Sequence, residues 1–88
     1  MIHITLYGTA GCHLCEEAET VIFEACRVSK ARIHLERVDI AGDSELENRY
    51  GLRIPVLVEQ LTDTEISWPF DAPSLASFFS RANPFQWA

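Results

Sequence analysis

The sequence IHITLYGTAGCHLC, residues 2–15, contains the signals from which the architecture follows. Apolar residues occupy every second position from Ile2 to Leu6, which predicts a strand over Ile2–Tyr7 with one buried face. A loop of small residues follows, and then two cysteines, Cys12 and Cys15. The cysteine pair therefore stands directly after a strand, at the point where a helix is expected to begin.

Helical spacing of apolar residues predicts a helix over His13–Ser29, and the residues expected on its buried side are Leu14, Ala18, Val21, Ile22 and Ala25. The imperfect alternation of the next strand suits a sheet edge or a bulge. The further expected elements are strands at Ile33–Ile40, Ile54–Val58 and Glu65–Trp68 and helices at Ser44–Tyr50 and Ala72–Ala82.

These elements predict an α/β fold in the order βαβαββα, with a four-stranded mixed sheet flanked by helices. A right-handed crossover makes the first two strands parallel. A short turn at residues 62–64 makes the last two antiparallel. We expect one domain over residues 1–88, with the apolar tail Phe85–Ala88 packed against its body.

Charge and composition exclude several classes of partner. The net charge is −6 and the chain has a single lysine, Lys30, so it lacks the basic patch of a nucleic-acid-binding protein. No apolar run is long enough to span a membrane, and Met1 to Leu6 does not have the pattern of a signal peptide. We therefore expect a cytoplasmic monomer without nucleic-acid or membrane partners. In the cytoplasm a close cysteine pair is more often catalytic or metal-binding than structural.

The position of Cys12 and Cys15 at a helix start suits thiol chemistry. Free backbone N–H groups and the helix dipole favour an anion there, and the thiolate is the reactive form of cysteine. A spacing of three residues on a helix brings both sulfurs within disulfide range. We predict that Cys12 attacks a substrate disulfide and that Cys15 resolves the mixed disulfide. A protonated His13 would favour the thiolate further, whereas Glu16 and Glu17 oppose it.

Two other hypotheses for the function of this chain are consistent with the sequence. The first is a metal- or cluster-binding module, although a tetrahedral zinc site needs four ligands and the chain has no second CxxC. The second is a domain that binds a partner without redox turnover, through an apolar surface at Trp68 and Phe70. We favour redox chemistry, and we expect no metal and no bound cofactor.

The segment Leu6–Ala18 together with Trp68–Asp71 resembles small bacterial glutaredoxin-like proteins of the thioredoxin superfamily. The resemblance covers nearly the whole chain and implies the thioredoxin fold and disulfide exchange. It implies that the Ile54–Pro55 bond is cis and that the Ile54 backbone pairs with a substrate. Asp71 matches the aspartate with which glutaredoxins hold their ligand, although Asp is also a favoured cap residue and the cap is the stronger expectation. Arg53, next to Pro55, either attracts a substrate carboxylate or is an ordinary surface arginine.

The chain also departs from the glutaredoxin pattern at the positions that hold glutathione. Thr9 stands where glutaredoxins carry a lysine, and Trp68 and Pro69 stand where they carry glycines. The resemblance therefore implies a disulfide substrate, either a protein or a glutathione mixed disulfide, with glutathione possible as co-substrate. Cys26 is expected to be a small buried hydrophobe. The sequence assigns no role to His3 and His34.

Overall fold

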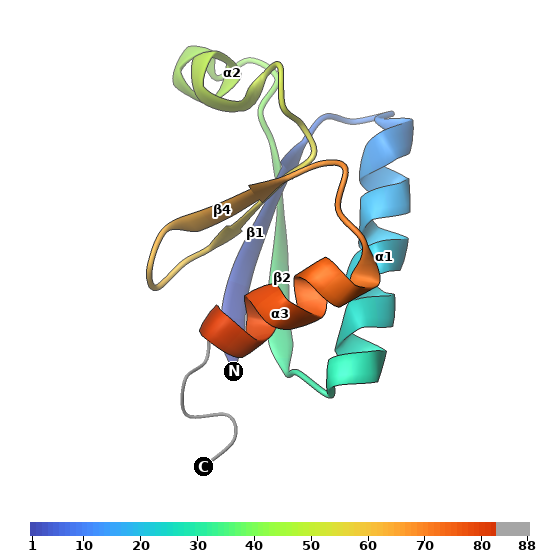
Figure 1. The fold of residues 1–88 in the computed structure, drawn as a ribbon. Coiled ribbons are helices and arrows are strands. Elements are labelled where there is room, and N and C mark those ends of the chain that lie inside the picture. The colour runs from blue at the N-terminus through green and yellow to red at the C-terminus, as the bar shows by residue number, and fades with distance from the viewer. Residues whose placement is uncertain (83–88) are drawn as a thin grey trace.

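Four strands form one mixed sheet with the order β2-β1-β3-β4 (Figure 1). The computed structural model describes residues 1–82. Strands β1 and β2 are parallel, whereas β3 is antiparallel to both β1 and β4, which confirms the predicted fold class and element order. The elements are β1 (Ile2–Gly8), α1 (His13–Ser29), β2 (Ile33–Asp39), α2 (Ser44–Tyr50), β3 (Val56–Glu59), β4 (Thr64–Ser67) and α3 (Ala72–Ala82).

The three helices begin and end where the sequence predicts, and the strands differ by one or two residues. Strand β3 begins at Val56 rather than at Ile54, because Pro55 has no N–H to donate to the ladder. Strand β4 begins at Thr64, one residue early, because Thr64 pairs with Glu59. Strand β2 is an edge strand, as its imperfect alternation predicts. The predicted packing of Phe85–Ala88 lies outside the described residues.

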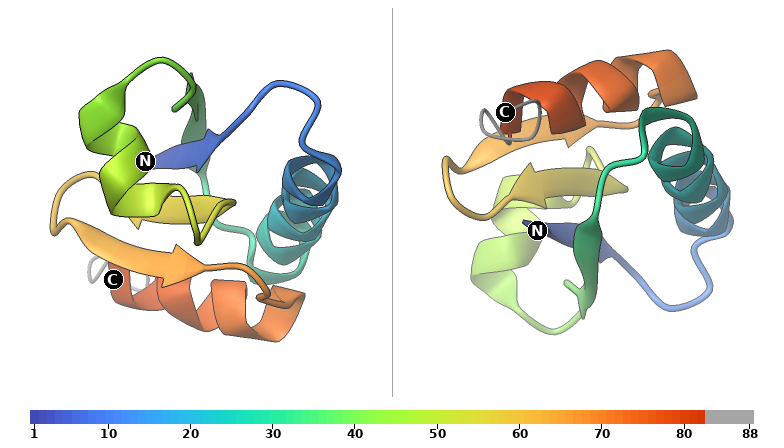
Figure 2. Two further views of the ribbon diagram at one scale, coloured as in Figure 1. Left: turned by 90° about the horizontal axis from the view of Figure 1, so that it is seen from above. Right: turned by 90° about the horizontal axis from the view of Figure 1, so that it is seen from below.

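Helices α1 and α3 cover one face of the sheet and α2 lies on the other (Figure 2). The larger core cluster joins β1, β3, α1 and α3 around Phe79, Leu57 and Ile22, which are fully buried. The smaller cluster joins Tyr50 of α2 to the opposite side of β3. Helix α2 covers only part of its face, so side chains near the start of β1 and β2 stay open to solvent.

One predicted core residue is wrong. Leu14 is 44% exposed, while the buried residues of α1 are Cys15, Ala18, Ile22 and Ala25. Leu14 precedes Cys15 by one position, which turns its side chain about 100° around the helix from the buried stripe. Cys15 therefore takes the core-facing place that the apolar pattern assigned to Leu14.

A buried carboxylate organises the β3–β4 turn. Glu59 is 2% exposed and accepts hydrogen bonds from the backbone N–H groups of Leu61 and Thr62, at 2.8 and 3.0 Å, and from the Thr62 hydroxyl. Burial raises the pKa of a carboxyl, but these hydrogen bonds outweigh it and hold the pKa of Glu59 below its ordinary value.

No helix among the described residues has the length and apolar character needed to cross a bilayer.

Candidate functional site

Cys12 and Cys15 form a disulfide at the N-terminus of α1, with their Cα atoms 5.2 Å apart. Cys12 is the N-cap residue, and its Sγ accepts a hydrogen bond of 3.1 Å from the backbone N–H of Cys15. Cys12 is partly exposed, whereas Cys15 is only 9% exposed and faces the core. The two sulfurs therefore differ in access, and the accessible one receives the hydrogen bond of the helix terminus.

Two glycines, one at the end of β1 and one in the loop that follows, position the cysteines. Gly11 has a φ of +76°, a left-handed conformation that a side chain disfavours, and it turns the chain into α1. Gly8 ends β1 directly beneath Cys15, where an added Cβ would lie 2.5 Å from the Cys15 Sγ. The absence of a side chain at Gly8 thus makes room for the buried sulfur.

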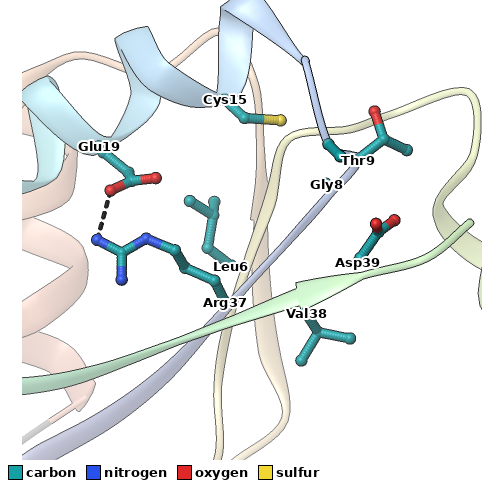
Figure 3. A pocket seen from close by; sticks show the side chains of 9 residues that line it. Leu6, Gly8, Thr9, Cys15, Glu19, Arg37, Val38 and Asp39 are labelled. Carbon is teal, nitrogen blue, oxygen red and sulfur yellow. Dashed lines mark hydrogen bonds and ion pairs between the residues drawn. The ribbon is translucent and has the colours of Figure 1, made fainter.

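A cavity of about 270 Å³ lies beside Cys15, between α1 and the ends of β1 and β2 (Figure 3). Leu6 and Gly8 line it together with Asp39, and Arg37 of β2 reaches Glu19 of α1 across one side of it. The hydrogen bond from Arg37 lowers the pKa of Glu19, and burial opposes this only in part. Sequence reasoning missed this cavity, because it forms only where α1, β1 and β2 come together in the folded chain.

Ile54 and Pro55 lie immediately before β3, joined by a cis peptide bond. Pro55 is buried and Ile54 is half-buried, and the Pro55 carbonyl accepts a hydrogen bond of 3.0 Å from the Trp68 N–H. The Trp68–Pro69 bond is also cis, which sequence reasoning did not anticipate. Two X–Pro segments therefore meet at the end of the sheet where β3 begins.

Arg53 is exposed but already has partners. Its guanidinium donates to Glu65 at 3.0 Å, to Ser67 at 3.2 Å and to the Arg49 carbonyl at 3.1 Å. It also lies over the ring of Tyr50, 5.5 Å from the centroid. Arg53 thus ties the end of α2 to β4, and only its remaining N–H groups are available to a ligand.

His13 and Asp71 each interact with their own helix. The exposed His13 ring lies 3.6 Å from Glu16 and 3.8 Å from Glu17, so its nearest charged neighbours are these carboxylates. Asp71 accepts a hydrogen bond of 2.9 Å from the Ser74 N–H, which confirms it as the cap of α3. Hydrogen bonds from the Ser74 backbone and side chain hold the pKa of Asp71 below its ordinary value.

Two apolar side chains, one within the motif and one after β4, are accessible to a partner. Leu14, between the two cysteines in sequence, is exposed, and Trp68 is half-buried. Trp68 packs edge-on against Phe70, with 5.0 Å between ring centroids, and Phe70 belongs to the core. This confirms the expectation that at least one of the two aromatic residues packs in the core.

Comparison with known proteins identifies one family and two similar solved structures. Residues 3–80 match the model of the glutaredoxin-like domain (DUF836). The crystal structure of the structural genomics target XcR50 from X. campestris is 40% identical, covers 89% of this chain and 96% of its own, and superposes with a TM-score of 0.71. The solution structure of Ne2328 from Nitrosomonas europaea is 30% identical over 90% of this chain and 92% of its own, with a TM-score of 0.77. The curated proteins contain no match.

Thioredoxins share the fold at lower identity. Thioredoxin-2 of the malaria parasite is 14% identical, covers 92% of this chain and 82% of its own, and has a TM-score of 0.66, so its likeness concerns the fold alone. Together with the family match over residues 3–80, it confirms the thioredoxin-like α/β fold that the sequence indicates. The chain belongs to the glutaredoxin-like domain family (DUF836) of the thioredoxin superfamily.

Proposed function

We propose that this protein is a thiol–disulfide oxidoreductase in which Cys12 is the nucleophile and Cys15 the resolving thiol. The supporting observation is the unequal setting of the two sulfurs: Cys12 is partly exposed and accepts the Cys15 N–H at 3.1 Å, while Cys15 is buried against Gly8. A hydrogen bond to sulfur at a helix N-terminus favours the thiolate. Attack on a substrate disulfide requires an accessible sulfur, and Cys15 is buried.

The proposed reaction starts from the reduced protein. The Cys12 thiolate attacks one sulfur of a substrate disulfide, an S–S bond forms between protein and substrate, and the other substrate sulfur leaves as a thiolate. Cys15 then loses its proton to water or buffer and attacks the Cys12 sulfur, releasing the second substrate thiolate and forming the Cys12–Cys15 disulfide. Two electrons pass from the dithiol to the substrate. A thiol reductant returns them to complete the cycle.

The substrate is proposed to dock at the edge formed by Ile54 and Pro55, as the family resemblance implies. Exposed Leu14 and half-buried Trp68 offer apolar contacts that suit a protein disulfide. A glutathione mixed disulfide is the smaller alternative, for which Arg53 and Asp71 would supply the polar contacts. His13, exposed beside Cys12 in sequence, is proposed to contact the substrate at the helix start. We place the reaction in the cytoplasm and the protein as a monomer.

Single-cysteine variants test the division of roles. Cys12→Ser is expected to lose all exchange with a disulfide substrate, because it removes the nucleophile. Cys15→Ser is expected to accumulate a mixed disulfide through Cys12, which peptide mass analysis after alkylation detects. Cys26→Ser is the matched control and should behave as the native chain. Full activity in Cys12→Ser, or trapping through Cys15 in that variant, would contradict the proposal.

Equilibration in graded reduced and oxidised glutathione tests the dithiol itself. A Cys12–Cys15 disulfide with a midpoint near about −200 to −230 mV would make glutathione a suitable donor, and one near about −270 mV would favour a thioredoxin-type reductant. Failure of the disulfide to form at any ratio would refute the proposal.

A further inference from the structure

The two histidines without a role in the sequence analysis lie side by side on the open face of the sheet. His3 of β1 and His34 of β2 are direct partners in the parallel register, and their ring centroids are 5.4 Å apart. Both residues are exposed. They line a cavity of about 370 Å³ with Thr5, Glu36 and other residues. Imidazole is the commonest side-chain ligand of transition metals, so two histidines that line one cavity are candidate ligands.

The separation of the rings fits a particular geometry. A tetrahedral zinc ion lies about 2.0–2.1 Å from each imidazole nitrogen, so two rings bound to one ion have centroids about 5.2 Å apart. Ligands at the right angle of a square-planar or octahedral ion would bring the centroids to about 4.5 Å. The observed 5.4 Å between the His3 and His34 ring centroids is close to the separation of two tetrahedral positions.

We propose that His3 and His34 bind one Zn²⁺ ion on the open face of the sheet. Within residues 1–82 no set of three or more His, Cys, Asp or Glu side chains is arranged to hold a metal, so water occupies the two remaining positions. Glu36 of β2 lines the same cavity, and its carboxylate adds negative charge that favours a cation. This site shares no ligand with the Cys12–Cys15 pair and does not depend on the proposed redox activity.

The test is calorimetric titration of the disulfide form with Zn²⁺. The disulfide removes the Cys12 and Cys15 thiolates as competing ligands. We expect one equivalent of zinc to bind the native chain, and His3→Gln and His34→Gln each to weaken binding about a hundredfold, because either change removes the chelate. Since both side chains are exposed, each variant should keep the native melting temperature.

Two control variants address the competing ligands. His13 lies within 3.8 Å of two carboxylates, so His13→Gln tests the most credible alternative, and Cys26→Ser tests the free thiol. Both variants should bind zinc as tightly as the native chain. In ¹⁵N spectra, zinc should shift the ring signals of His3 and His34 together and leave His13 unchanged. Loss of binding in either control variant with retention in His3→Gln and His34→Gln would overturn the proposal, as would no binding by the native chain.

Discussion

Replacing Gly8 with alanine should make the Cys12–Cys15 disulfide easier to reduce. The new Cβ would lie 2.5 Å from the Cys15 Sγ, whereas non-bonded atoms of this size normally stay about 3.5–4.0 Å apart. The backbone at Gly8 cannot readily retreat, because its carbonyl accepts the Ile40 N–H at 2.9 Å and the residue pairs with Asp39. The sulfur must therefore move by about 1 Å.

The two redox states accommodate this movement differently. In the disulfide form the Cys15 sulfur is bonded to Cys12 and cannot turn away from residue 8. In the dithiol form it can rotate toward the cavity of about 270 Å³ that it lines. Overpacking of this kind costs about 1–3 kcal/mol. Because the disulfide form carries most of this overpacking cost, the midpoint potential of the Cys12–Cys15 pair becomes less negative by about 20–65 mV.

The assay is equilibration of native and Gly8→Ala chains in the same glutathione series, with acid quench, alkylation and intact mass. Gly42→Ala is the control: alanine is strained at the Gly42 φ of +86°, but its added Cβ would meet open space. That variant should lose stability without a change in potential. An unchanged midpoint in Gly8→Ala, or an equal shift in both variants, would refute the reasoning.

Three further predictions concern reactivity and stability. Burial raises the pKa of the Cys26 thiol, so in the reduced protein iodoacetamide should modify Cys12 first and Cys26 much more slowly; the reverse order in a peptide-mass time course would contradict this. Asp71→Ala should lower the melting temperature at neutral pH by removing the cap of α3. Hydrogen bonds from Ser74 lower the folded-state pKa of Asp71, so the stabilisation by this carboxylate is complete above its unfolded-state pKa and is lost as pH falls through its folded-state pKa. The difference in melting temperature between the native chain and Asp71→Ala should therefore shrink in acid. A difference that stays constant with pH would exclude the cap as its cause. Phe79→Ala should cost about 3–5 kcal/mol in urea unfolding, since Phe79 is fully buried, and a loss below about 1 kcal/mol would mean that α3 does not pack as described.

Local patterns in the sequence were sufficient to predict the helices, the strands and the proximity of the two cysteines. Apolar periodicity and the cap at Asp71 place α1 and α3 at their observed bounds. Cys12 and Cys15 are close for a local reason, because a spacing of three on a helix brings their Cα atoms to 5.2 Å. These features depend on residues near one another in the chain, which the order of amino acids records directly.

Tertiary structure decided which cysteine is buried and which distant residues meet. Cys15 is buried because α1 packs on the sheet with that residue facing Gly8, and the same rotation turns Leu14 outward. His3 and His34 are neighbours only because β1 and β2 pair in one parallel register, and a shift of a single residue would place them on opposite faces. No local pattern encodes such a register, since it is set by how the apolar side chains of separate segments pack together.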